Sequence, residues 1–353
     1  MDQSPLRVVM SALTFVPGHM GGSETYARSL ATALAGRSDV HLTTVVTEAA
    51  AGLLAHDGEV VVPEVTGGAR AHQRVRTLVQ AARRRRALPS GVVHYPFTVP
   101  LPGAAGPWVT SLLDVQHRDL PDMFGRPERW YRTFAYDGAA RRASRVLTIS
   151  EFARERIVAT LGVDPALIDV APLGVDRTVF TPEPVERLPF VYYPAAAWPH
   201  KNHEGLLAAM EILRRGRPEV RLVLSGGMQE QLGPLPAWAE HRGHLTGAEV
   251  LALYRSAACL AYPSRYEGFG LPPLEAMAVG TPVAASAVAS IPEVCGNAAI
   301  LFDPDDPRSI AAGVEQAIGA GDRLRDLGLK RAAEFTWERC AEAHVASYRA
   351  AAR

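Results

Sequence analysis

Short apolar runs alternate with longer amphipathic stretches along most of the chain. Apolar runs such as Arg7–Leu13, Val92–Tyr95 and Val109–Leu113 predict buried strands, and the longer stretch Glu24–Ala35 predicts a helix. Strands that alternate with helices imply parallel sheets joined by right-handed crossovers, so the pattern predicts an α/β fold. The other elements predicted in the first half are the strands His41–Val46, Val60–Val62, Arg145–Ile149 and Ile168–Ala171, and the helices Ala71–Leu88, Pro127–Ala143 and Ser150–Thr160.

The alternation stops at Pro172–Pro189, a charged segment rich in proline, and then starts again. We interpret this segment as a linker, and expect domains at residues 1–177 and 178–335, with a last helix over residues 336–353. The second half predicts the strands Phe190–Tyr193, Arg221–Leu224, Cys259–Tyr262, Pro282–Ala285 and Ala299–Phe302, and the helices Asn202–Arg214, Ala248–Ser256, Leu274–Val279, Pro307–Ala320, Leu324–Ala333 and Trp337–Ala351.

Composition narrows the possible functions. A chain of 353 residues with 48% hydrophobic residues can bury two ordinary cores. The formal net charge is zero, so no overall charge favours nucleic acid or an acidic membrane. The three cysteines form no paired motif, and no apolar run is long enough to span a bilayer. We therefore expect a cytoplasmic protein without a leader peptide.

The stretch from Glu267 to Glu275 is the most informative part of the chain. Its two carboxylates flank a Gly-Phe-Gly turn and the pair Pro272–Pro273, which favours a helix start. Free N–H groups at a helix start attract phosphate, and carboxylates accept hydrogen bonds from hydroxyls. This combination suits a sugar nucleotide, although a loop with ordinary helix-capping chemistry fits the spacing as well.

The wider string Tyr262–Val283 closely resembles the donor-site signature of retaining glycosyltransferases of family 4, which have the GT-B fold. The resemblance implies two Rossmann-like domains whose parallel sheets face an interdomain cleft. It implies that Glu267 contacts the donor sugar, that Glu275 accepts hydrogen bonds from the ribose, and that a backbone segment binds the sugar or phosphates. That segment comprises Gly268, Phe269, Gly270 and Leu271.

Two motifs in the first half fit the same resemblance. Gly21 and Gly22 follow the first strand, where family 4 enzymes carry a similar Gly-Gly-x-Glu near the donor phosphates or the acceptor. The same glycines also fit a plain loop with Ser23 as helix cap. A subset of the family shows Asp-x-Gln-His-Arg after a later strand, which assigns a role near the donor sugar to His117. A structural loop histidine is the other interpretation.

Lys201 is one of only two lysines in the chain and precedes a predicted helix. In the family a lysine here binds the donor diphosphate, commonly with an arginine a few residues earlier. No arginine stands there in this chain, so we expect Arg265 or His200 to supply the second charge. Asn202 is placed to cap the helix that follows.

No motif predicts a metal site. Asp303-Pro-Asp305 has the D-x-D form that holds a metal in other glycosyltransferases, but we interpret it as a loop far from the other motifs. The histidines form no H-x-x-x-H pair. The one charge run, Arg83–Arg86, is interpreted as a solvated helix end or as a contact with acidic lipid or a phosphorylated acceptor.

The resemblance therefore implies a metal-independent, retaining transferase without a cofactor. It would move a hexose-type sugar from a GDP- or UDP-type donor to a small-molecule or glycan acceptor. Nucleic-acid binding is not expected, and Arg83–Arg86 would permit peripheral membrane contact. The alternatives are a sugar-nucleotide epimerase or a glycogen-type phosphorylase with a related fold, and a non-catalytic protein that binds sugar nucleotides.

Overall fold

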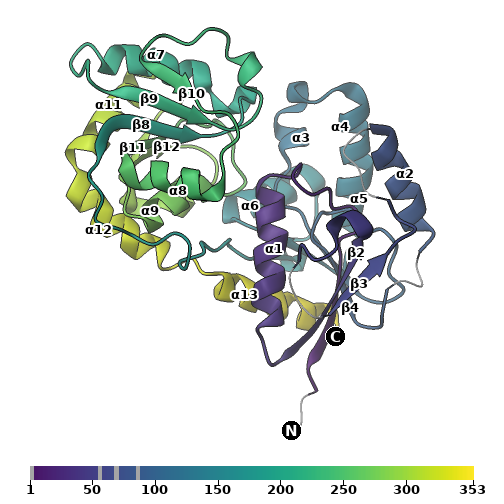
Figure 1. Cartoon of the computed structure of the whole chain (residues 1–353). Helices are drawn as coiled ribbons and strands as arrows, with labels where there is room; N and C mark the ends of the chain where they lie inside the picture. Colours follow the sequence, from purple (N-terminus) through teal and green to yellow (C-terminus); the bar gives the residue numbers. More distant parts are fainter. Residues whose placement is uncertain (1–3, 55–57, 67–70, 85–87) are drawn as a thin grey trace. The chain divides into compact units, whose positions relative to one another are not determined.

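The chain forms two compact α/β units, shown in Figure 1. The computed structural model describes residues 4–54, 58–66, 71–84 and 88–353. Unit 1 comprises Met1–Gly174 together with Trp337–Arg353, and unit 2 comprises Val175–Thr336. Each unit has its own parallel sheet, so the predicted architecture of two Rossmann-like domains is confirmed.

Unit 1 contains a seven-stranded sheet in the order β3-β2-β1-β4-β5-β6-β7, and every neighbouring pair is parallel. The change of direction in strand order falls between β1 and β4, where open sheets of this type leave room for a ligand beyond the strand ends. The strands are β1 (Leu6–Ser11), β2 (Val40–Thr47), β3 (Glu59–Val62), β4 (Val92–Tyr95), β5 (Trp108–Ser111), β6 (Arg145–Thr148) and β7 (Ile168–Val170).

The helices of unit 1 match the apolar pattern, with one break. The predicted helix Pro127–Ala143 is divided by a π-helical turn that directs the Asp137 carboxylate into the interior. The predicted helix Ala71–Leu88 ends at Ala82, and residues 85–87 lie outside the described residues. The helices are α1 (Gly22–Ala35), α2 (Ala71–Ala82), α3 (Gln116–Asp119), α4 (Arg126–Arg132), the π turn η4 (Thr133–Asp137), α5 (Gly138–Arg142), α6 (Glu151–Leu161) and α13 (Trp337–Ala351), with 3-10 turns η1 (Glu48–Ala50), η3 (Pro121–Met123) and η5 (Pro165–Leu167).

Helix α13 joins unit 1 through a buried polar network. Tyr348 Oη lies 2.9 Å from His94 Nδ1, and His344 Nε2 lies 2.7 Å from Tyr26 Oη. Ser111 Oγ completes the network at 2.8 Å from His94 Nε2 and 2.6 Å from Tyr26 Oη. Because buried polar groups are costly unless they are paired, these contacts fix how α13 packs against α1, β4 and β5.

Unit 2 contains a six-stranded parallel sheet in the order β10-β9-β8-β11-β12-β13. Its central strands are apolar and buried on both faces, as parallel sheets require. The short strand β10, which contains Glu240 and His241, was not predicted from the apolar pattern. The strands are β8 (Leu188–Pro194), β9 (Arg221–Ser225), β10 (Ala239–His241), β11 (Ala257–Tyr262), β12 (Val283–Ser286) and β13 (Ile300–Phe302).

Some helices of unit 2 begin with side-chain caps that the sequence encodes. Thr246 and Glu249 form a reciprocal capping box at the start of α8. Gly328 brings α12 close to α9, since a Cβ at this position would lie 3.2 Å from Met277 Cγ. The helices are α7 (His203–Leu213), α8 (Gly247–Ser256), α9 (Leu271–Ala278), α10 (Ile291–Cys295), α11 (Pro307–Gly319) and α12 (Gly321–Ala332), with 3-10 turns η6 (Pro199–Lys201), η7 (Gln229–Gln231) and η8 (Gly296–Ala298).

The segment interpreted as a linker is fastened to unit 2. Arg187 donates to the carbonyl oxygens of Ala257 at 2.8 Å and Gly280 at 2.6 Å, which lie after α8 and α9. Val175, where the chain enters unit 2, and Phe335, near the point where it leaves, are joined: Val175 N donates to Phe335 O at 3.2 Å. The described part of the chain contains no helix that is long and apolar enough to cross a membrane.

Candidate functional site

Two neighbouring strands of unit 2 bring the predicted site residues together. Strands β8 and β11 pair in parallel, so the segments after them emerge at the same edge of the sheet. Lys201 follows β8 and Glu267 follows β11. Ligands of open α/β sheets bind beyond the carboxyl ends of the strands, which is where both side chains lie.

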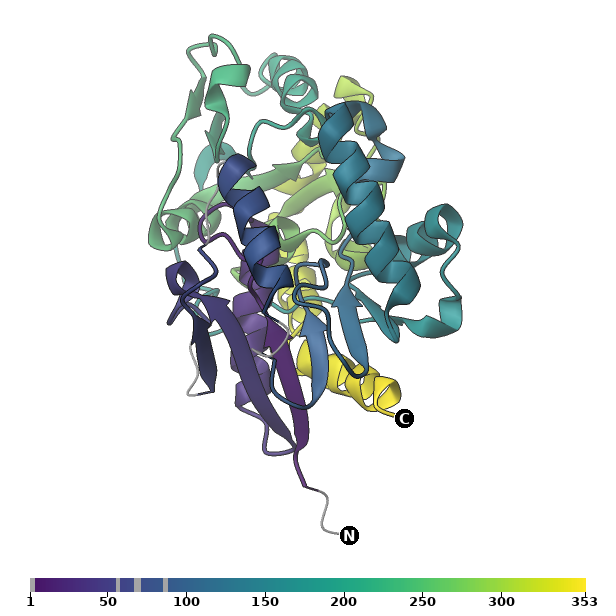
Figure 2. The ribbon, with the colours of Figure 1, turned by 90° about the vertical axis from the view of Figure 1, so that its right-hand side faces the viewer.

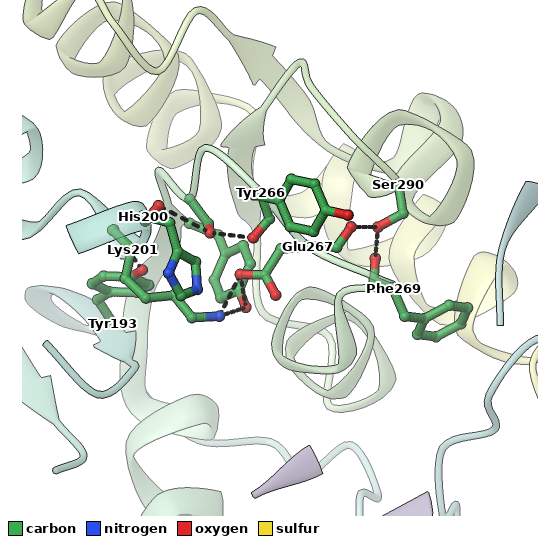
Figure 3. Close-up of polar contacts among 9 residues, drawn as sticks. Tyr193, His200, Lys201, Tyr266, Glu267, Phe269 and Ser290 are labelled. Atoms are coloured by element: carbon green, nitrogen blue, oxygen red, sulfur yellow. Dashed lines mark hydrogen bonds and ion pairs between the residues drawn. The ribbon is translucent and has the colours of Figure 1, made fainter. Parts of the chain in front are cut away.

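Lys201 and Glu267 form a close ion pair. Lys201 Nζ lies 2.5 Å from Glu267 Oε1, which also accepts a hydrogen bond of 2.8 Å from Tyr262 Oη (Figure 3). Only 17% and 13% of the two charged side chains are exposed. Burial by itself would raise the pKa of Glu267, but Lys201 and the hydrogen bonds outweigh it and hold the pKa below its usual value. Glu267 is therefore ionised at neutral pH.

The backbone around Lys201 is held on both sides. Tyr193 Oη donates to Lys201 O at 2.7 Å, as Figure 3 shows. Asn202 adopts a left-handed conformation with φ of 58°, and its Oδ1 caps α7 by accepting from Gly205 N at 3.2 Å. The predicted cap is thus confirmed, and Asn202 Nδ2 also donates to Pro304 O at 2.7 Å.

The loop from Glu267 to α9 is shaped by Gly270 and Ser290. Gly270 has a φ of +120°, and a Cβ there would lie 2.7 Å from Ile291 Cδ1, so this position requires glycine. Ser290 Oγ contacts Glu267 O at 2.9 Å and Phe269 O at 2.6 Å (Figure 3). Helix α9 then begins at Leu271, three residues before the predicted Leu274. In its first turn Pro272 and Pro273 carry no N–H, and Leu274 N donates to Gly270 O at 3.4 Å.

Glu275 lies one helical turn later than predicted, inside α9. Its Oε2 accepts a hydrogen bond of 2.9 Å from Tyr254 Oη. Burial raises the pKa of Glu275 to about 7, although the hydrogen bond from Tyr254 acts in the opposite direction. Two carboxylates of one motif thus differ in charge state, because Glu267 has a cationic partner and Glu275 has a neutral one.

His200 does not supply the second positive charge that was expected beside Lys201. Burial, followed by the charge of Lys201, lowers the pKa of His200 to about 4, so His200 is neutral at physiological pH. Arg265 N donates to His200 O at 2.8 Å, and Arg265 Nε donates to Asp305 Oδ1 at 2.6 Å. The expectation that Asp303-Pro-Asp305 lies far from the other motifs is therefore wrong, because the loop after β13 folds back against Arg265.

Metal ligands do not gather in the described residues: no group of three or more His, Cys, Asp or Glu side chains there is placed to hold a metal ion.

In unit 1, Gly21 lies directly before α1, in the loop that follows β1, and Gly22 is the first residue of that helix. Gly21 has a φ of +50°, and open space surrounds the Cβ positions of both glycines. The loop is closed by Glu24, whose Oε2 accepts from Gly18 N at 2.7 Å. Gly21, not Ser23, precedes the first residue of the helix, and no side chain caps it.

His117 lies inside unit 1 with 1% of its surface exposed. Its Nε2 lies 2.8 Å from Asp137 Oδ1, and Asp137 also pairs with Arg118. Among the residues that the structure describes, His117 Nδ1 has no hydrogen-bond partner. A contact of this histidine with a sugar stays a prediction.

Sequence reasoning did not identify four polar contacts of these sites. Tyr254 lies in a predicted helix and Tyr262 ends a predicted strand, and neither was given a polar contact, although each hydroxyl donates to a glutamate. Asp137 lies inside a predicted helix. Ser290 follows β12 in an Ala-Ser-Ile-Pro stretch without a charged residue, and no sequence signal distinguishes it.

Family models match both halves of the chain. The model described as glycosyl transferases group 1 matches residues 176–331, which include Lys201, Glu267 and Glu275. The model described as glycosyltransferase family 4 matches residues 20–179, which include Gly21, Gly22 and His117.

Individual relatives agree with these models. The chain is 30% identical over 266 residues to O-antigen chain mannosyltransferase B of Escherichia coli, covering 68% of this chain and 70% of the relative. It is 34% identical over 219 residues to D-inositol 3-phosphate glycosyltransferase of Segniliparus rotundus, covering 54% of this chain but only 48% of that relative.

A solved structure shares the architecture over nearly the whole length. Anabaena HepE in complex with UDP-glucose superposes with a TM-score of 0.73 at 17% identity, covering 96% of this chain and 97% of that one. At this identity the likeness concerns the fold. With the family models and the E. coli relative, it establishes that the chain belongs to the family 4 (group 1) glycosyltransferases and has the GT-B fold.

Proposed function

We propose that the chain is a retaining hexosyltransferase that takes its sugar from a nucleotide diphosphate sugar and needs no metal ion. The observation that carries this proposal is the Lys201–Glu267 ion pair at the carboxyl edge of the unit 2 sheet. A lysine so placed supplies positive charge to a diphosphate, as a divalent metal does in other transferases.

Lys201 would bind the diphosphate, and Glu267 would contact the transferred sugar. Glu267 already holds the Lys201 ammonium group at 2.5 Å, so this positive charge would be in position before the donor binds. The backbone N–H groups of Gly268–Leu271, which lead into the N-terminus of α9, would add partial positive charge. Arg265 would supply a second full charge by exchanging its partner Asp305 for a phosphate oxygen.

Glu275 would accept hydrogen bonds from the two ribose hydroxyls. With a pKa of about 7 in the free protein, the Glu275 carboxyl is partly ionised at neutral pH, and two hydroxyl donors would stabilise its ionised form. Tyr254 fixes one oxygen of the carboxylate and so sets the direction of the other.

The reaction we propose is a front-face substitution at the anomeric carbon. The bond between this carbon and the diphosphate oxygen breaks, and a bond to the acceptor oxygen forms on the same face. The acceptor proton passes to the departing phosphate oxygen. The main barrier is charge separation, which Lys201 and the α9 N-terminus would lower by fixed positive charge.

The substrates are proposed from the relatives. The E. coli relative is named a mannosyltransferase, and the HepE structure contains UDP-glucose, so we propose a hexose carried by GDP or UDP. We assign the acceptor-side role to residues 1–177, with Gly21 and Gly22 facing the donor phosphates or the acceptor and His117 near the donor sugar. The acceptor is a polysaccharide, a lipid-linked precursor or a secondary metabolite.

Peripheral membrane contact through Arg83 and Arg84 is also proposed. The other two arginines of that run, at 85 and 86, lie outside the described residues.

A thermal-shift screen tests donor binding. A donor that binds only the folded protein raises its melting temperature. At a donor concentration of one hundred times the dissociation constant, the folded state gains about 2.7 kcal/mol of stability. GDP-mannose, GDP-glucose, UDP-glucose and UDP-galactose form the panel. Failure of every member to raise the melting temperature would contradict the proposal.

Substitution of Lys201 tests its role. Lys201→Met should reduce transfer from the identified donor by about 100-fold or more, because one electrostatic contact to the leaving group is lost. Lys330→Met is the matched control, since it makes the same change at the other lysine, on the exposed side of α12. Equal activity of the two variants would remove Lys201 from the mechanism.

Product analysis separates the remaining alternatives. A retaining transferase gives the anomeric configuration of the donor, which proton NMR reads from the coupling at the anomeric carbon. Activity should persist in excess EDTA. Conversion of the sugar nucleotide without any acceptor would instead identify an epimerase, and donor binding without turnover would identify a binding protein.

A further inference from the structure

Two aromatic rings on the surface of unit 1 are exposed to solvent. Trp130 on α4 and Phe134 on the π turn are 69% and 67% exposed. Their rings stack with centroids 5.7 Å apart and an angle of 5° between the planes. Single exposed apolar residues are common, but two large rings stacked on a surface form a patch that requires an explanation.

The same stretch also carries rings that are packed, so the exposure is selective. Tyr136 packs against the core cluster of unit 1 and meets the His117 ring edge-on at 6.0 Å. The π turn adds a residue to the helical repeat, which turns Asp137 inward while Phe134 stays one turn beyond Trp130 on the outside.

Exposed arginines precede and follow the ring pair along the chain. Arg126 is exposed one turn before Trp130, and Arg142 lies one turn beyond Gly138, where its Nη1 would be 3.0 Å from an added Cβ. The acidic side chains of the stretch are engaged elsewhere. Glu128 pairs with Arg132 at 3.0 Å, and Asp137 is buried against His117 and Arg118. The patch is therefore both aromatic and cationic.

A second helix on the same side of unit 1 has the same character. Figures 1 and 2 show α2 and α4 on one side of the unit. On α2, Val75 and Val79 are exposed one turn apart, with the exposed Arg76 beside them and Arg83 after the helix end. Apolar and basic side chains thus recur on two separate elements.

We propose that this side of unit 1 docks on a membrane surface that contains anionic phospholipids. Trp130 and Phe134 would lie at the level of the headgroups, where aromatic rings are favoured, and the arginines would meet lipid phosphates. A sugar-binding platform would need hydroxyl, amide or carboxylate partners next to the rings, whereas the flanking groups here are cationic. Docking of this kind requires no particular donor or linkage.

Vesicle co-sedimentation tests the surface. The wild-type protein should bind vesicles of phosphatidylcholine with phosphatidylglycerol at least tenfold better than vesicles of phosphatidylcholine alone. The double variant W130S/F134S should lose at least tenfold on the mixed vesicles. R126Q/R142Q should lose about 25-fold there, at about fivefold for each arginine near an anionic surface, and should change nothing on the neutral vesicles.

A pair of matched controls keeps the result specific. Leu167→Ser removes an exposed apolar side chain elsewhere on unit 1 and should leave vesicle binding unchanged. Trp130→Phe should retain binding but abolish the quenching of protein fluorescence by lipids brominated on their acyl chains. All variants should keep the melting temperature and the donor-induced shift, because the altered side chains are on the surface.

Three outcomes would overturn the proposal. They are an absence of wild-type binding to anionic vesicles, equal binding by W130S/F134S, and saturable binding of a soluble polysaccharide at Trp130 in place of vesicles.

Discussion

Replacing Lys201 by methionine should destabilise the protein by an amount that depends on pH. The substitution removes the charge and keeps most of the side-chain length. At 2.5 Å and an effective dielectric constant of about 20, the Coulomb energy of the pair is about 7 kcal/mol, which is an upper limit. Removing one member of a buried pair commonly costs about 3–5 kcal/mol. Because both side chains keep some exposure to water, we expect about 2–3 kcal/mol at pH 8.

The sign of the pH dependence follows from the pKa of Glu267. In the wild-type protein this pKa lies below its unfolded value, so the group stabilises the fold above the unfolded pKa of 4.5 and loses that effect as the pH falls. Without Lys201, burial dominates and raises the pKa of Glu267 above 4.5. The carboxyl then takes up a proton at mildly acidic pH, so the cost of Lys201→Met should shrink from pH 8 to pH 5.

Thermal and urea unfolding at pH 5, 6, 7 and 8 measure this difference. A loss of 2–3 kcal/mol corresponds to a fall of about 4–12 °C in melting temperature for a domain of this size. Lys330→Met should differ from the wild type by less than about 0.5 kcal/mol at every pH, since its side chain is exposed. The same cost at pH 5 and pH 8 would refute the reasoning. So would a double variant K201M/E267Q whose loss equals the sum of the single losses to within about 0.5 kcal/mol.

Three further predictions concern other contacts. Donor affinity, measured by calorimetry, should fall as the pH drops from 8 to 6, because Glu275, with a pKa of about 7, must lose its proton to accept two hydroxyls; Glu275→Gln should bind more weakly and without this pH dependence. Asn202→Ala should lower the free energy of unfolding by about 2 kcal/mol through loss of a helix cap and a buried hydrogen bond, as urea titration would show. Tyr348→Phe should cost about 1–3 kcal/mol in the same titration, since it leaves His94 Nδ1 buried without a partner, and a loss below 0.5 kcal/mol would contradict the importance of that contact.

The apolar pattern predicted most strands well because parallel strands buried on both faces are continuous apolar runs. It failed where polar contacts shape the backbone. The strand Ala239–His241 contains two polar residues at the sheet edge, and the break at Thr133–Asp137 depends on the partners that Asp137 finds in the interior. Neither requirement is visible in local hydrophobicity.

Motifs identified the site residues of unit 2, but not their relations. Lys201 and Glu267 are far apart in the sequence, and their contact follows from the adjacency of β8 and β11 in the sheet. The loop containing Asp305 was misplaced for the same reason, since strand order does not say how far a loop folds back toward Arg265. The different charge states of Glu267 and Glu275 depend on burial, which only the folded chain determines.

The placement of α13 imposes an order on how the protein is made. Unit 1 is interrupted between Gly174 and Trp337, and its buried network needs His344 and Tyr348 from the far side of that interruption. A ribosome therefore delivers all of unit 2 while unit 1 still lacks a helix and exposes Tyr26, Ser111 and His94 to water. The second unit can fold first during translation, and the first unit becomes complete only after it.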